Sequence, residues 1–124
     1  MFITNGDEVI NLNLVRFVQC FEDNFTIRLN IDEHQFALFR FEDEYPYSET
    51  KKEIIEMLEG TSSSWKLIDN NMMVRIDKLQ YANAVGSELK MFFDTGVVKT
   101  IHKQVYKLMH ALTEVTRSIY FEDC

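Results

Sequence analysis

The chain has 124 residues, of which 46% are hydrophobic and 13% aromatic, and 20 acidic residues against 13 Lys and Arg give a net charge of −7. This length suits one compact domain, and the apolar content argues against intrinsic disorder. The acidic balance disfavours nucleic acid as a partner, although a basic stripe on one face could still bind it.

Targeting and redox features favour a cytoplasmic protein. No apolar run approaches the roughly 18 residues that a membrane helix needs, and the segment MFITNGDEVI has no signal-peptide pattern. Cys20 and Cys124 form no CxxC pair and no disulfide framework, which fits a reducing compartment. We therefore expect no membrane contact and no disulfide.

Residues 2–41 alternate short apolar stretches with turn signals, which predicts β-hairpins. The Asn5-Gly6 pair is the strongest of these signals, because a tight two-residue turn needs positive φ at both central positions. In FTIRLNI (25–31) apolar and polar residues alternate, as in a half-buried antiparallel strand. FALFRF (36–41) is apolar on both faces, so we expect a strand that is covered on both sides.

After the acidic segment EDEYPY, the hydrophobic period changes to that of a helix, which we expect near Ser48 to Glu59. Thr50 and Glu53 are spaced as a capping box, and Gly60 is placed to end the helix in the left-handed conformation. A short flexible connector follows, and we place the boundary between two halves of the chain at residues 61–64.

The pattern of the first half returns 64 residues later, so that Ile10 in VINLNLVRFV aligns with Val74 in VRIDKLQYA, and Phe17 aligns with Tyr81. Strands at 72–76, 79–84 and 89–93, joined by turns, repeat the order of the first half. We therefore expect an α+β fold. It would consist of two tandem antiparallel-sheet-plus-helix repeats, residues 1–60 and 65–124, packed as one pseudo-twofold domain.

The second repeat should end in a long amphipathic helix. Its apolar residues alternate in spacing between four and three, and this seam consists of Ile101, Val105, Leu108, Leu112, Val115 and Ile119. The seam could pack on the chain's own sheet or on a second copy in a homodimer, and the sequence leaves both open.

The densest acidic run also contains two tyrosines, a residue type that is favoured at interfaces. This candidate partner-binding segment consists of Glu42, Asp43, Glu44, Tyr45, Tyr47 and Glu49. It could attract a basic partner or a cation, although such a run is usually a solvated loop.

Catalytic constellations are missing from the sequence. The four glycines belong to neither GxGxxG nor GxxxxGK[ST], so no phosphate loop is expected. His102 and His110 lie two turns apart on the last predicted helix, but no HExxH and no third ligand accompany them. We expect no enzyme, no cofactor and no metal site; a small hydrolase or metal enzyme using these histidines would need bound metal.

Basic and aromatic residues are neighbours at several points, as in Arg16-Phe17, Phe39-Arg40-Phe41 and Lys90 beside Met91-Phe92, and Arg28 lies between Ile27 and Leu29. On an exposed sheet face such residues could stack single-stranded bases. Most of the aromatic residues nevertheless occupy positions that we expect in the core.

Two resemblances concern nucleic acid. The stretch from Met72 to Leu112, MMVRIDKLQYANAVGSELKMFF through HAL, resembles the first strands and helix of LytTR-type DNA-binding domains over about a third of the chain. The match ends there, since the chain closes in RSIYFEDC without the basic strands that those domains use on DNA. In topology alone, two sheet-then-helix units also resemble duplicated single-strand binders of the Whirly and PUR types. No functional residue can be transferred from either.

The absence of catalytic constellations, the acidic charge and the aromatic content favour a non-catalytic interaction protein. We expect a small phage or bacterial accessory protein that contacts a protein partner and forms a homodimer. The alternative is a single-stranded nucleic-acid-binding protein that uses one sheet face.

Overall fold

The computed structural model describes residues 1–68, 70–101 and 108–112, and its described part is a mixed α/β fold of antiparallel sheets with one main helix. Its regular elements are β1 (Phe2–Thr4), β2 (Val9–Asn11), the 3-10 helix η1 (Leu12–Leu14), β3 (Phe17–Phe21), β4 (Thr26–Asn30), β5 (Phe36–Arg40), α1 (Glu44–Thr61), β6 (Trp65–Ile68), β7 (Met72–Arg75), the 3-10 helix η2 (Ile76–Lys78), β8 (Leu79–Val85), β9 (Glu88–Phe93) and β10 (Gly96–Ile101). Residues 108–112 are also helical. No helix in these ranges is long and apolar enough to cross a membrane.

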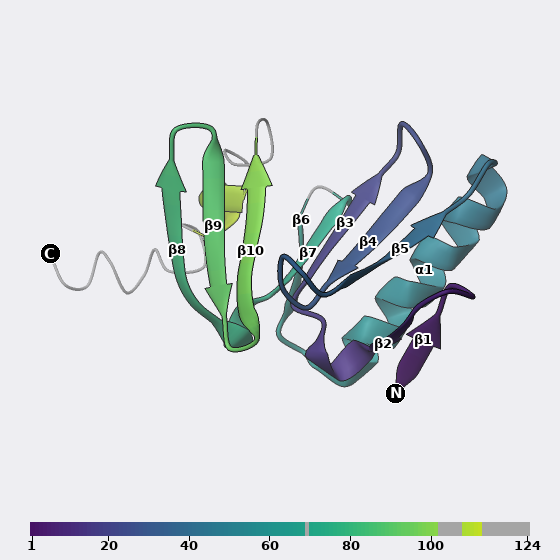
Figure 1. Ribbon diagram of the computed structural model, residues 1–124, viewed down its shortest axis with the longest axis horizontal. Coiled ribbons are helices and arrows are strands. Elements are labelled where there is room, and N and C mark those ends of the chain that lie inside the picture. The colour runs from purple at the N-terminus through teal and green to yellow at the C-terminus, as the bar shows by residue number, and fades with distance from the viewer. Residues whose placement is uncertain (69, 102–107, 113–124) are drawn as a thin grey trace, which may run out of the picture.

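The strands form three sheets. The largest has the order β5-β4-β3-β7-β6, a second has the order β10-β9-β8, and β1 pairs with β2 alone. Figure 1 shows the five-stranded sheet between the three-stranded sheet on one side and α1 on the other. The helix and the smaller sheet therefore cover opposite faces of the larger sheet.

The pairing of β3 with β7, in which Phe17 lies opposite Val74, changes the predicted arrangement. It adds the hairpin β6–β7 to the sheet of β3, β4 and β5 across the connector at residues 61–64. The α+β class is correct, but the structure does not show two sheet-plus-helix units packed as a pseudo-twofold domain, because one sheet takes strands from both halves. The positions of the predicted strands in the second half agree with β7, β8 and β9.

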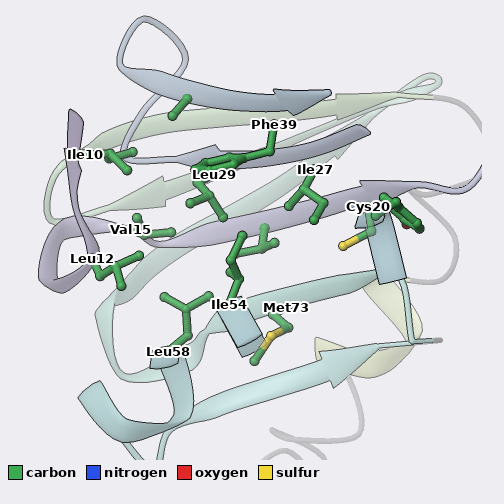
Figure 2. Close-up of a cluster of buried hydrophobic side chains, with 13 residues drawn as sticks. Ile10, Leu12, Val15, Cys20, Ile27, Leu29, Phe39, Ile54, Leu58 and Met73 are labelled. Carbon is green, nitrogen blue, oxygen red and sulfur yellow. The ribbon is translucent and has the colours of Figure 1, made fainter. Parts of the chain in front are cut away.

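Two groups of buried side chains form the core. Figure 2 shows the first, in which Ile54 and Leu58 of α1 face the five-stranded sheet. Its sheet residues include Val18, Cys20, Ile27, Leu29, Ala37, Phe39 and Met73. The second lies on the opposite face of that sheet and consists of Phe17, Ile68, Met72, Val74, Leu89, Met91, Phe93, Val98, Leu108 and Ala111.

Helix α1 begins one turn earlier than predicted, at Glu44, with Asp43 as its N-cap residue. Pro46 is tolerated in the first turn because the first amide groups of a helix need no intrahelical acceptor. Because the helix begins at Glu44, Thr50 and Glu53 both lie inside it, and the predicted capping box was wrong. Gly60 does not end the helix either, because α1 continues to Thr61.

The turn at Asn5-Gly6 forms, with Gly6 at φ +100°, but it belongs to a four-residue connection between β1 and β2. The Asn5 side chain explains the longer turn: its Oδ1 accepts hydrogen bonds from the amides of Asp7 at 2.9 Å and Glu8 at 2.7 Å. The predicted hairpin is thus confirmed, and its two-residue form was wrong.

Candidate nucleic-acid interface

Charge is divided unevenly between the helix and the strands. Helix α1 carries the carboxylates Glu44, Glu49, Glu53, Glu56 and Glu59 against two lysines, Lys51 and Lys52. The strands contain one carboxylate, Glu88, and six basic residues, Arg28, Arg40, Lys66, Arg75, Lys90 and Lys99. The net charge of −7 therefore conceals sheets that are locally basic.

The side of β4 and β5 that α1 does not cover carries Arg28, Phe36, Leu38 and Arg40, which we call the arginine face. Within it, Arg28 lies opposite Leu38 and Arg40 lies opposite Thr26. Neighbouring residues along both strands point to the helix side, because side chains alternate between the faces of a sheet. The strand residues of the arginine face include no Asp or Glu.

The prediction that β5 is covered on both sides was wrong. Ala37 and Phe39 on the helix side are buried, at 1% and 7% exposure, whereas Phe36 and Leu38 are half-buried and Arg40 is exposed. The side chain that lies over Phe36 comes from the neighbouring strand, a contact that a hydrophobic pattern does not reveal.

That side chain is Arg28, whose guanidinium carbon lies 3.8 Å from the centroid of the Phe36 ring. Its Nε donates a 2.8 Å hydrogen bond to Oδ1 of Asn30, and the buried Asn30 in turn donates to the carbonyl of Phe17 at 3.1 Å. These contacts fix the guanidinium on the sheet. Partial burial lowers the pKa of Arg28, but an arginine remains charged at neutral pH.

Among the arginines that the structure describes, Arg28 and Arg40 have no ion pair with a described carboxylate, in contrast to Arg16 and Arg75. Arg16 pairs with Asp94 at 2.7 Å and Arg75 pairs with Asp77 at 3.1 Å. Lys51 pairs with Glu22 at 2.9 Å and Lys99 pairs with Glu33 at 3.5 Å. No ion pair with a described carboxylate therefore neutralises the two arginines of the arginine face.

Arg16 and Phe17 were also candidates for base stacking, and the structure removes both. Arg16 is 4% exposed and donates two hydrogen bonds to the carboxylate of Asp94, from Nε at 2.7 Å and from Nη2 at 3.1 Å. Phe17 is fully buried in the second core group. The Arg16–Asp94 pair ties the start of β3 to the turn between β9 and β10, which is a structural role.

A hollow of about 680 Å³ lies beside Arg40, between the β1–β2 hairpin, the end of β5 and α1. Arg40 lines it together with Asp7, Glu8 and Glu53, so the charge inside the hollow does not suit a phosphate. The part of the chain that the structure describes contains no group of three or more His, Cys, Asp or Glu side chains that could hold a metal ion.

The acidic partner-binding segment is divided between a loop and a helix. Glu42 and Asp43 are exposed before α1, and Glu44, Tyr45 and Glu49 are exposed on its first turns, with Tyr45 at 75%. Tyr47 is 1% exposed and packs in the first core group, so it cannot contribute to a surface as predicted. Burial also raises the pKa of its hydroxyl.

The predicted seam is only partly described. Ile101 ends β10 and so does not begin a helix, Leu108 is fully buried in the second core group, and Leu112 is half-buried. Val105, Val115 and Ile119 lie outside the described residues. Leu108 thus packs on sheets of its own chain rather than on a second copy.

Of the remaining candidates, His110 is exposed in the helical segment 108–112, whereas His102 and Cys124 lie outside the described residues. Cys20 is a free thiol under α1, and burial raises its pKa to about 11. A thiol with that pKa is almost wholly protonated at neutral pH and therefore a poor nucleophile.

No protein-family model matches the chain, and no curated protein matches it. Among solved structures, the chain is similar to the LytTR DNA-binding domain of a methyl-accepting/DNA response regulator from Bacillus cereus. The two share 12% sequence identity over 82% of this chain and 84% of that chain, with a TM-score of 0.43.

This comparison corrects our main functional prediction. That structure is described as a DNA-binding domain, so the comparison gives no support to a protein that acts through protein–protein contacts, and the nucleic-acid alternative replaces that reading below. Our prediction relied on net charge, which reports the whole chain and not the distribution of charge between α1 and the strands.

Proposed function

We propose that the protein binds single-stranded nucleic acid through the arginine face. The observation that carries the proposal is the guanidinium of Arg28, held 3.8 Å above the Phe36 ring on a sheet face whose strand residues include no carboxylate. Arg40 lies on the same face and is exposed. Arginine next to an aromatic side chain on an open sheet is a combination that suits unstacked bases and phosphates.

Each group of the arginine face has a role in this proposal. Because Nε of Arg28 is used by Asn30, Nη1 and Nη2 would meet a phosphate or the edge of a base. A base would stack on the guanidinium plane, with Phe36 as the support beneath it. Arg40 lies two residues along β5 from Leu38, the ladder partner of Arg28, and would contact a second phosphate.

The acidic helix would orient the nucleic acid. Helix α1 covers the opposite face of the same sheet and carries five carboxylates, so a phosphate backbone is repelled from that side. Binding on the arginine face would therefore be modest in affinity, tolerant of sequence and strongly dependent on salt.

We also propose that the chain arose by duplication. A hairpin, a 3-10 turn and three strands occur in this order twice, as β1-β2-η1-β3-β4-β5 and as β6-β7-η2-β8-β9-β10. The alignment at a spacing of 64 residues supports the same idea. With this spacing, Thr26 and Arg28 of β4 correspond to Lys90 and Phe92 of β9.

The test measures fluorescence anisotropy of a labelled single strand of mixed sequence, about 20 nucleotides long, across a series of salt concentrations. Arg28→Gln should weaken binding most, because it removes both a phosphate contact and the stacking plane, and Arg40→Gln should weaken it less. Each lost phosphate contact should reduce the slope of log K against log salt by about 0.7 for a single strand.

Lys52→Gln is the matched control, because it makes the same charge change on the exposed surface of α1. The proposal is wrong if the arginine variants bind like Lys52→Gln, or if the unmodified protein does not bind the strand at low salt. A duplex of the same sequence that binds more tightly than the single strand would contradict the stacking part.

A further inference from the structure

The outer face of the three-stranded sheet carries a second group of basic and aromatic residues. Leu89, Met91 and Phe93 of β9 point inward to the second core group, so Lys90 and Phe92 between them lie on the outer face. Lys90 is the cross-strand partner of Lys99, and the Phe92 ring lies 5.5 Å from that of Tyr81. We call Tyr81, Lys90, Phe92 and Lys99 the lysine face.

The lysine pair is unfavourable unless an anion compensates it, because like charges directly opposite each other in a sheet repel. Lys99 has partial compensation from Glu33 at 3.5 Å and from Glu88 at 4.0 Å. Lys90 has no ion pair with any carboxylate in the described part of the chain. The aromatic residues beside the pair are accessible, with Tyr81 at 58% exposure and Phe92 half-buried.

The lysine face adjoins the arginine face at the connection between β4 and β5, which Figure 1 shows beside β10. The amide of Glu33 donates a 2.7 Å hydrogen bond to the carbonyl of Val97, and Oγ1 of Thr95 donates to the carbonyl of Ile31 at 2.7 Å. This connection leads directly into Phe36 of the arginine face. Glu33 is thus the carboxylate that stands at the junction of the two faces.

From this geometry we propose that the lysine face is a second contact surface for the same single-stranded nucleic acid, and that Glu33 competes with its phosphates for Lys99. The inference depends on the proposed function. A phosphate would bind between Lys90 and Lys99, and a base would stack on the Tyr81–Phe92 pair. Single-stranded nucleic acid is the occupant because the face pairs two cations with two accessible rings.

The experiment measures binding of the same labelled strand, about 20 nucleotides long, to four variants of the full chain. The double variant Lys90→Gln/Lys99→Gln should reduce the magnitude of the salt slope by about 1.4, the loss of two phosphate contacts on a single strand. Glu33→Gln should act in the opposite direction and tighten binding severalfold at low salt, because it removes the nearer of the two carboxylates that pair with Lys99. A gain of affinity cannot come from unfolding.

Glu59→Gln is the matched control for Glu33→Gln, and Lys52→Gln makes half the charge change of the double lysine variant; both controls lie at exposed positions of α1. A weaker lysine variant together with a tighter Glu33→Gln variant supports the inference. If Arg28→Gln weakens binding but the lysine variant and Glu33→Gln behave like the controls, the inference is overturned and the proposed function stands. If the unmodified protein does not bind the strand, both are overturned.

Discussion

The two faces of the five-stranded sheet are built on different physical principles. On the helix side, buried side chains of β3, β4, β5 and β7 pack in one core group with α1, and Ile27, Leu29 and Leu58 are fully buried. On the other side, the three-stranded sheet covers β3 and β7, and the arginine face on β4 and β5 is closed only in part by its own Arg28.

This difference separates stability from binding within one sheet. Burial of apolar surface is the main stabilising contribution to folding, so the helix side should dominate the free energy of unfolding. The arginine face buries less apolar surface and leaves two cations without ion pairs among the described carboxylates. Such a surface contributes little to stability and is suited to a ligand.

Truncation of one leucine on each side should have the largest effect and test this division directly. Leu58→Ala removes a fully buried side chain beneath α1 and should lower the free energy of unfolding by about 3 kcal/mol. Leu38→Ala removes a half-buried side chain on the arginine face and should cost about 1 kcal/mol. Urea unfolding followed by circular dichroism measures both values.

The two substitutions also differ in their position relative to the proposed binding surface, because Leu38 belongs to the arginine face and Leu58 does not. Leu58→Ala should bind the labelled strand normally under conditions where it is folded, because it leaves the arginine face unchanged. Equal losses of stability for the two variants would mean that both sides of the five-stranded sheet contribute equally to the free energy of unfolding. The proposed separation of stability from binding would then be incorrect.

Much of the local structure could be predicted from the sequence, because it depends on neighbouring residues. The alternation in FTIRLNI correctly predicts β4, and Asn5-Gly6 correctly predicts a hairpin turn. The pairing of β3 with β7 could not be predicted. It joins residues that are far apart in the sequence, such as Phe17 and Val74, and it depends on packing of the whole chain. The predicted start of α1 was too late, because the helix was placed after the acidic segment EDEYPY, whereas residues 44–47 of that segment form its first turn.

The candidate site shows why a sequence cannot rank similar residues. Arg16 and Arg28 both lie next to apolar residues, yet Arg16 is enclosed with Asp94 from 78 positions away and Arg28 lies on an open face. The signal that could have distinguished the arginine face is the strong excess of basic over acidic residues in the predicted strands. Net charge alone hides that excess, because α1 and the turns carry most of the carboxylates.

A second comparison, between two glycines, tests the junction of the arginine and lysine faces. Gly96 has φ +140°, and a Cβ there would lie 2.9 Å from Cβ of Asp32. Asp32 cannot move freely, because its Oδ1 accepts hydrogen bonds from the amides of His34 and Gln35, both at 2.7 Å. Gly96→Ala should therefore cost about 2 kcal/mol of stability.

Gly60→Ala is the matched control, since Gly60 lies in α1 with open space around its Cα. That substitution should stabilise the protein by about 0.5 kcal/mol, because alanine favours a helix over glycine. Thermal unfolding monitored by circular dichroism measures both changes. A Gly96→Ala variant as stable as the unmodified protein would show that the β4–β5 connection is not packed against the β9–β10 turn.

The smallest expected effect concerns the ion pair between Arg16 and Asp94, whose contribution to stability depends on pH. The hydrogen bond from Arg16 holds the pKa of Asp94 below its usual value, so the carboxylate stabilises the folded state above its pKa in the unfolded chain, about 3.9. This contribution is lost as the pH falls through the lower pKa of the folded state. Asp94 is 39% exposed, so water screens the pair and we expect about 1 kcal/mol at pH 7.

Asp94→Asn should therefore be less stable than the unmodified protein at pH 7, and the difference should shrink in strong acid, where Asp94 itself is protonated. Urea unfolding of both proteins from pH 7 down to the lowest pH at which they fold measures that difference. The subtraction is necessary because the pKa values of Glu22 and Asp77 are lowered as well and contribute to acid destabilisation in both proteins. A difference that does not change with pH would mean that the shape of the side chain, and not its charge, holds Arg16 at this junction.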